Sequence, residues 1–135
     1  MTSVDVTGSV PRFPQREIAA FARRVLRHLD VDANDLAIAF VDDSEMTSLN
    51  RRFRHKKRTT DVLTFPGDDA IHLGDIIISV DQARRQAADE KHSLGTEVRY
   101  LIVHGILHAL GYDHETDHGE MNALELKVRD AVGLS

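Results

Sequence analysis

Hydrophobic residues recur along the chain with two periods, which predict that strands and helices alternate. Between Pro14 and Leu29 they recur at helical spacing, so an amphipathic helix is expected to open at Pro14. From Leu36 to Val41 every position is apolar, as in a strand that is covered on both faces. Ser3 to Val10 is a candidate first strand that precedes both elements.

Capping and turn residues mark the next elements. Asp42 with Glu45 three residues later is a capping-box pattern, which predicts a short helix ending near position 52. Thr60 to Phe65 is a β-branched and aromatic run stopped by proline and glycine, so a strand and then a turn are expected. Ile71 to Val80 is predicted to be a further strand, with Gly74 as a bulge or a point of close approach.

Three helices are expected in the rest of the chain. The first covers Asp81 to Lys91, the second is strongly apolar and is capped by Ser93 or Thr96, and the third covers Asp117 to Ala131. The order β-α-β-α-β-β followed by three helices predicts an α+β fold. We expect one domain over residues 1–135, with a small mixed sheet and helices packed mainly on one face.

Composition narrows the class of protein. With 41% hydrophobic and 29% charged residues in 135 positions, the chain has the composition of an ordinary soluble domain. The absence of cysteine excludes disulfides and thiolate metal ligands, and it suits a reducing cytoplasm. Neither a signal-peptide pattern nor an apolar run long enough for a membrane span is found. The net charge of −5 argues against generic nucleic-acid binding, although local clusters matter more than the sum.

Three histidines at and just after the end of the apolar helix are candidate metal ligands. His104 and His108 are four positions apart, so on a helix their side chains are neighbours on one face. Gly111 offers a left-handed cap that ends the helix, and His114 follows three residues later. Three neutral imidazoles that converge on one point, with a fourth position open, are a usual ligand set of catalytic zinc. We therefore predict one zinc ion per chain on this helix, which would be central to the fold.

A plainer interpretation is that these histidines are hydrogen-bonded core residues. The surrounding residues favour the metal, because the segment from Leu101 to Leu110 is apolar on all sides and predicts burial. Two imidazoles buried so close together need partners, and a metal ion satisfies both while they stay neutral.

The same histidine spacing occurs in metzincin peptidases, where a glutamate after the first histidine serves as the general base. Gly105 occupies that position here, so the peptidase base is missing. A zinc ion held by three imidazoles still makes a bound water more acidic and polarises a bound oxygen, which supports hydrolysis of a carbonyl or phosphoryl group. A phosphoryl substrate also needs cations near its developing negative charge.

Cations are concentrated in residues 51–58, which carry six formal positive charges in an acidic protein. The plain interpretation of such a run is a solvated loop. Phe53 and His55 interrupt it, however, and their rings are suited to stacking on bases. The run also leads directly into the strand predicted from Thr60, and an arginine in it is suited to contact a phosphate through two parallel hydrogen bonds.

Three segments resemble the YbeY endoribonucleases, bacterial factors for ribosomal RNA maturation. The run from His104 to His114, HGILHALGYDH, resembles the zinc signature of that family. Residues 49–66, LNRRFRHKKRTTDVLTFP, are similar to its pattern Asn-x-x-Tyr-Arg-x-Lys followed by Thr-Asp-Val-Leu-Ser-Phe-Pro. Leu73 to Ile76 resembles a third block of the family. The segments occur in the family's order and together span positions 49 to 114.

The resemblance implies roles for individual residues. The zinc ligands would be His104, His108 and His114. Arg54 would be the catalytic or RNA-contacting arginine of the Tyr-Arg motif. Asp75, in the third block, would be a supporting residue. Independently of the resemblance, Asp113 is a candidate to orient a ligand imidazole. The other candidate RNA contacts are the remaining cations of the run, Arg51, Arg52, Lys56, Lys57 and Arg58.

The sequence departs from the family's pattern at four positions. Phe53 replaces the usual tyrosine, Ala109 replaces a larger aliphatic residue, and Thr59 and Thr64 stand where proline and serine are common. None of these changes removes a predicted ligand or the arginine. Thr59 restricts the loop less than proline would.

The expected function is that of a zinc-dependent endoribonuclease that cleaves single-stranded RNA in the cytoplasm. Ribosomal RNA precursors would be its substrate, in maturation and ribosome quality control, and ribosomal proteins or the small ribosomal subunit are candidate partners. Whether water or the neighbouring 2′-hydroxyl attacks stays open. Two alternatives also stay open: a zinc peptidase or amidohydrolase, which Gly105 and the basic run count against, and a non-catalytic RNA-binding assembly factor with a structural zinc.

Overall fold

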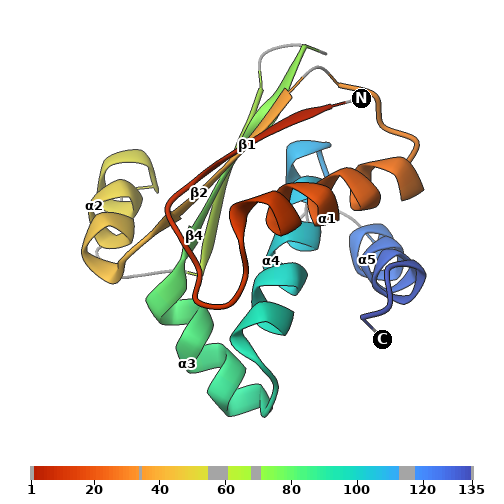
Figure 1. Cartoon of the computed structure of the whole chain (residues 1–135). Coiled ribbons are helices and arrows are strands. Elements are labelled where there is room, and N and C mark those ends of the chain that lie inside the picture. Colours follow the sequence, from red (N-terminus) through yellow and green to blue (C-terminus); the bar gives the residue numbers. More distant parts are fainter. Residues whose placement is uncertain (1, 34, 55–60, 68–70, 113–117, 135) are drawn as a thin grey trace.

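Four strands form one sheet in the order β1-β2-β4-β3 (Figure 1). The computed structural model describes residues 2–33, 35–54, 61–67, 71–112 and 118–134. The strands are β1 (Ser3–Thr7), β2 (Asp35–Val41), β3 (Val62–Pro66) and β4 (His72–Ser79). β1, β2 and β4 are parallel, whereas β3 pairs with β4 in the antiparallel direction, which confirms the predicted mixed sheet.

Five helices accompany the sheet in the described parts of the chain. They are α1 (Gln15–His28), α2 (Asp43–Arg54), α3 (Val80–Glu90), α4 (Leu94–Ala109) and α5 (Glu120–Ala131). In Figure 1, α1, α4 and α5 lie on one side of the sheet and α2 lies on the other. The chain is therefore a small α+β domain with its helices mainly on one face, as the sequence predicts.

Several predicted boundaries are wrong by one to three residues, for local reasons. Pro14 has ψ 147° and is the N-cap of α1 rather than its first residue. β1 ends at Thr7 instead of Val10 because the chain turns at Gly8, whose φ is +79°. A Cβ atom at Gly8 would lie 2.3 Å from the carbonyl oxygen of Phe40, so only glycine fits that turn. α3 begins at Val80, directly after β4.

Side-chain caps begin two of the helices, and one contact of the predicted capping box begins another. The Oγ atoms of Ser79 and Ser93 accept hydrogen bonds from the third backbone N–H after each of them, at 3.1 Å in both helices. Ser93, rather than Thr96, therefore caps α4. The backbone N–H of Glu45 donates to the Asp42 carboxylate at 2.8 Å, which confirms half of the capping box before α2.

The predicted irregularity at Gly74 is a β-bulge. Asp35 pairs with His72 and Ala37 with Asp75, so β4 carries one residue more than β2 across this interval. A Cβ atom at Gly74 would lie 2.8 Å from the carbonyl oxygen of Phe65, so the backbones also approach closely here. The bulge brings His72 and Asp75 to the same face of β4, although they are three residues apart.

Asp35 and Asp75 both accept hydrogen bonds from the His72 ring across this bulge. These bonds, the one to Asp35 first and the one to Asp75 second, hold the pKa of His72 above its ordinary value of 6.5. The stabilisation is present below pH 6.5 and disappears as pH rises through the higher pKa of the folded state. It is small, because the three side chains are 38–50% exposed and screened by solvent.

An NMR titration of the His72 ring tests this pairing. We expect a midpoint above 6.5, which Asp35→Asn lowers more than Asp75→Asn does, because the Asp35 bond is the larger cause. A midpoint that Asp35→Asn leaves unchanged would contradict the pairing.

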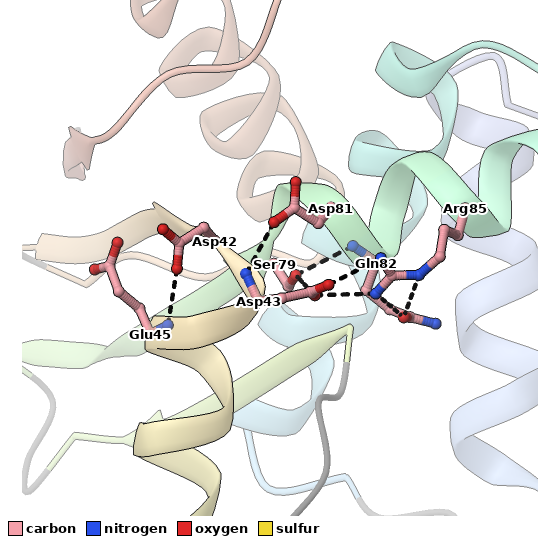
Figure 2. Close-up of polar contacts among 7 residues, drawn as sticks. All are labelled: Asp42, Asp43, Glu45, Ser79, Asp81, Gln82 and Arg85. Atoms are coloured by element: carbon pink, nitrogen blue, oxygen red, sulfur yellow. Dashed lines mark hydrogen bonds and ion pairs between the residues drawn. The ribbon is translucent and has the colours of Figure 1, made fainter.

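α2 is joined to α3 at the end of the sheet where β2 and β4 finish (Figure 2). The Asp43 carboxylate accepts hydrogen bonds from Arg85 Nη2 at 2.9 Å and from the Oγ of fully buried Ser79 at 3.1 Å. In return, the backbone N–H of Asp43 donates to the Asp81 carboxylate at 2.9 Å. These contacts fix the start of α2, the helix whose last turn carries the first arginines of the basic run.

α4 is the most buried helix among the described elements and forms the centre of the core. Val98, Ile102 and Ile106 are completely buried on it, and each such side chain stabilises the fold by about 1.5–3 kcal/mol. The contacts of α4 include β3, β4, α1, α3 and α5. No helix in the described parts of the chain is long and apolar enough to cross a membrane.

Candidate metal centre

α4 brings His104 and His108 together, as the spacing predicts. Their Nε2 atoms are 3.0 Å apart, and the ring centroids are 4.6 Å apart with the rings inclined at 76°. Both side chains are half-buried in the last two turns of the helix. Since Nε2 is the atom that each ring turns toward the other, an ion would be held through these two nitrogens.

The other nitrogen of His104 faces a carboxylate on a different helix. His104 Nδ1 lies 2.7 Å from Oε1 of Glu125, a residue of α5 that is 6% exposed. The second oxygen of that carboxylate lies 3.2 Å from Nη2 of Arg129. In a neutral imidazole, the proton shared with the carboxylate sits on Nδ1, which leaves the lone pair of Nε2 directed at His108. The donor chemistry of the pair therefore fits a divalent transition metal.

Glu125 is the site residue that the sequence analysis missed. It is an acidic residue at a core-facing helical position, between Met121 and Val128, both of which are buried. A carboxylate on the apolar stripe of a helix needs a buried partner, so the position of Glu125 in the helical pattern indicates a buried polar contact. The residue expected to orient a ligand, Asp113, lies outside the described residues.

The third predicted ligand, His114, also lies outside the described residues. Within the described residues, no three His, Cys, Asp or Glu side chains gather as a possible metal site. α4 ends at Ala109, and Gly111 has φ +101°, so the left-handed turn predicted after the helix is present.

Gly105 is buried where α4 crosses β4. A Cβ atom there would lie 2.7 Å from Cγ2 and 3.1 Å from Cδ1 of the completely buried Ile76. A glutamate at this position would have to enter the core, so the general base of the metzincin mechanism has no room in this fold. Glycine here serves packing, because it lets α4 approach the sheet.

We expect Gly105→Ala to destabilise the protein. Overpacking against Ile76 costs about 1–3 kcal/mol, and the better helix propensity of alanine offsets about 1 kcal/mol of that. The net loss of up to about 2 kcal/mol would appear as a lower midpoint in urea unfolding. Gly95→Ala is the matched control on the same helix, since its Cβ would meet the flexible end of Arg99 at 3.1 Å and the Oγ of Ser93 at an ordinary contact distance of 3.9 Å. A Gly105→Ala variant as stable as Gly95→Ala would contradict this packing.

A cavity of about 670 Å³ lies beside His104, between α3, α4 and α5. His104 and Arg129 line it, together with the carboxylates of Asp61, Asp89 and Glu90. Carboxylates outnumber cations in its described wall. A polyanion that reached His104 would therefore need positive charge from outside this wall.

The structure does not bring the first part of the basic run to the histidines. Arg51 and Arg52 are exposed in the last turns of α2, across the sheet from α4 (Figure 1). Arg54 ends α2, and its side chain lies outside what the structure describes, as do Lys56, Lys57 and Arg58. Beyond the run, Asp61 lines the cavity that His104 also lines. The RNA contacts of these residues stay predictions.

Asp75 is not beside the histidines either. Ile76 points toward α4, where it meets Gly105, so its strand neighbour Asp75 points to the opposite face. There, half exposed, Asp75 pairs with His72 at 3.3 Å. A supporting role of Asp75 would therefore have to act on the face of the sheet that α2 covers.

Comparison with known proteins gives one family for this chain. The family model described as Endoribonuclease YbeY matches residues 6–133. Endoribonuclease YbeY of Nautilia profundicola is 47% identical over 102 residues, 74% of this chain and 73% of the relative. The protein of the same name from Koribacter versatilis is 42% identical over 120 residues, 89% of this chain and 78% of the relative.

A solved structure shares the fold. The solution structure of TM1509 from Thermotoga maritima superposes with a TM-score of 0.68 at 25% sequence identity, over 96% of this chain and 89% of that one. The resemblance seen in the motifs thus extends over nearly the whole sequence. This chain belongs to the YbeY endoribonuclease family.

Proposed function

We propose that this protein is a zinc-dependent endoribonuclease that cleaves single-stranded RNA during ribosomal RNA maturation and ribosome quality control in the cytoplasm. Ribosomal proteins or the small ribosomal subunit are its candidate partners. Membership in a family of endoribonucleases supports the reaction class. The observation that supports the metal is the 3.0 Å approach of the His104 and His108 Nε2 atoms, with Glu125 behind His104.

The residues divide into metal-holding and charge-stabilising roles. His104, His108 and, by the motif, His114 would hold the zinc, which supplies Lewis-acid chemistry to a phosphoryl oxygen when it is bound. Arg54 would stabilise the negative charge that develops on the phosphate in the transition state. The other cations of residues 51–58 would hold the RNA backbone, because carboxylates predominate in the described wall beside His104.

Removal and restoration of the metal tests the proposal. We expect chelation to lower cleavage of a labelled single-stranded precursor RNA by more than about a hundredfold, since a catalytic metal supplies several kcal/mol. Zinc should restore cleavage, and an unstructured peptide should stay intact throughout. Cleavage of the peptide but not the RNA would instead favour a peptidase, and RNA binding without cleavage an assembly factor. A 2′,3′-cyclic phosphate on the product would identify the 2′-hydroxyl as the nucleophile.

A further inference from the structure

We propose that Glu125 is the positioning residue of the metal centre. It would hold the His104 ring with its proton on Nδ1, so that the lone pair of Nε2 points to the ion shared with His108. The inference rests on the proposed zinc site, and it adds a residue from outside the histidine motif. It predicts that metal affinity depends on α5 as well as on α4.

The first support is burial. The Glu125 side chain is 8% exposed, on a helix face shared with buried Met121 and Val128. An apolar residue would fill this place at no desolvation penalty, whereas a buried carboxylate is expensive unless it is paired. The 2.7 Å contact with His104 supplies that partner for the buried carboxylate.

The second support is the chemistry of imidazole. A neutral histidine carries its proton on either nitrogen, and only the unprotonated nitrogen binds a metal. An ionised carboxylate accepts hydrogen bonds and cannot donate them, so Glu125 selects the form of His104 with the proton on Nδ1. That form leaves Nε2, 3.0 Å from His108 Nε2, as the ligand atom.

The third support is that Glu125 is itself held in place. Arg129, one turn later on α5, lies 3.2 Å from its second oxygen. The Arg129 guanidinium packs 4.2 Å from the centre of the Tyr100 ring, and the Tyr100 hydroxyl donates to the carbonyl of Leu134 at 2.9 Å. Arg129 and Tyr100 thus tie α5 and the residues after it to α4 beside the histidines. A rigidly supported carboxylate keeps the ring from rotating away from the ion.

The chain provides a matched control. Glu97, on α4, is 8% exposed and lies 2.6 Å from Nε2 of His92, which is not part of the histidine motif. The pair has the same chemistry and similar burial. Replacing either glutamate by glutamine removes one buried carboxylate next to a histidine, but only Glu125→Gln alters a direct contact of His104.

The experiment measures the zinc affinity of the full-length protein by competition with a chromophoric chelator, and the stability of the metal-free protein by urea unfolding. We expect Glu125→Gln to weaken zinc binding ten- to hundredfold and Glu97→Gln less than threefold. Arg129→Gln, which leaves the contact with His104 in place, should give an intermediate loss. An unchanged affinity in Glu125→Gln, or equal losses in both glutamate variants, would overturn the positioning role.

A second measurement uses the wild-type protein, so it does not depend on whether a variant folds. Nitrogen-15 NMR of the metal-free wild-type protein should show the His104 ring with its proton on Nδ1, and a proton on Nε2 would overturn the proposal. His108→Ala separates this inference from the zinc site itself. Loss of zinc in His108→Ala with full affinity in Glu125→Gln would reject only the role of Glu125, whereas a wild-type protein that binds no zinc would reject both.

Discussion

Replacing His108 with alanine should abolish zinc binding and RNA cleavage while leaving the fold intact. Residues that only support metal ligands are typically worth ten- to hundredfold in affinity, so loss of a ligand should weaken zinc binding by more than about a hundredfold. Cleavage should fall on the order of 10³-fold, because the metal supplies several kcal/mol of transition-state stabilisation. The half-buried ring lies at the end of α4, so the helical circular dichroism signal should be retained.

His28→Ala is the control for this experiment. His28 is exposed in the last turn of α1 and lies outside the motif, so its loss should change neither zinc content nor cleavage. Elemental analysis and a labelled-RNA assay measure the two quantities. A His108→Ala protein that keeps its zinc, or one that loses zinc and still cleaves, would contradict the proposed centre.

Replacing Arg54 with alanine should lower kcat for RNA cleavage by about 10²–10³ and weaken RNA binding far less. Removal of a positioned donor that stabilises transition-state charge typically lowers kcat by about 10²–10³, whereas removal of one phosphate contact among several changes RNA affinity modestly. Zinc content should stay at the wild-type level, because arginine is not a ligand. Arg54→Lys should recover only part of the rate, since lysine cannot form two parallel hydrogen bonds to a phosphate.

Arg51→Ala separates catalysis from backbone binding. Arg51 is exposed on α2, across the sheet from α4, so its removal should raise KM and reduce the salt dependence of binding without lowering kcat (Figure 1). Equal kcat losses in Arg51→Ala and Arg54→Ala would argue against a specific transition-state role for Arg54.

Local sequence signals account for much of the fold and for the histidine pair. Every predicted element is present in order, because hydrophobic periodicity and caps such as Ser93 act within a few residues. The approach of His104 and His108 follows from helical geometry alone. The wrong boundaries are at element ends such as Gly8, where a close backbone contact decides the last residue.

Contacts between segments that are far apart in the sequence could not be predicted from such local signals. Glu125 meets His104 only because α5 packs on α4, which joins positions 21 residues apart. The face that Asp75 occupies depends on the strand register around the bulge at Gly74, and one residue of shift exchanges the two faces of a strand. The position of Arg51 across the sheet from α4 depends on which side of the sheet α2 covers (Figure 1).

Anomalous diffraction at the zinc absorption edge, from crystals of the full chain grown with zinc, is the most direct test of the metal centre. We predict one peak about 2.0–2.1 Å from the Nε2 atoms of His104 and His108, with His114 as a third ligand and one position left to solvent or substrate. No peak between the two rings, or a fourth protein ligand that closes the coordination sphere, would contradict a catalytic zinc at this site.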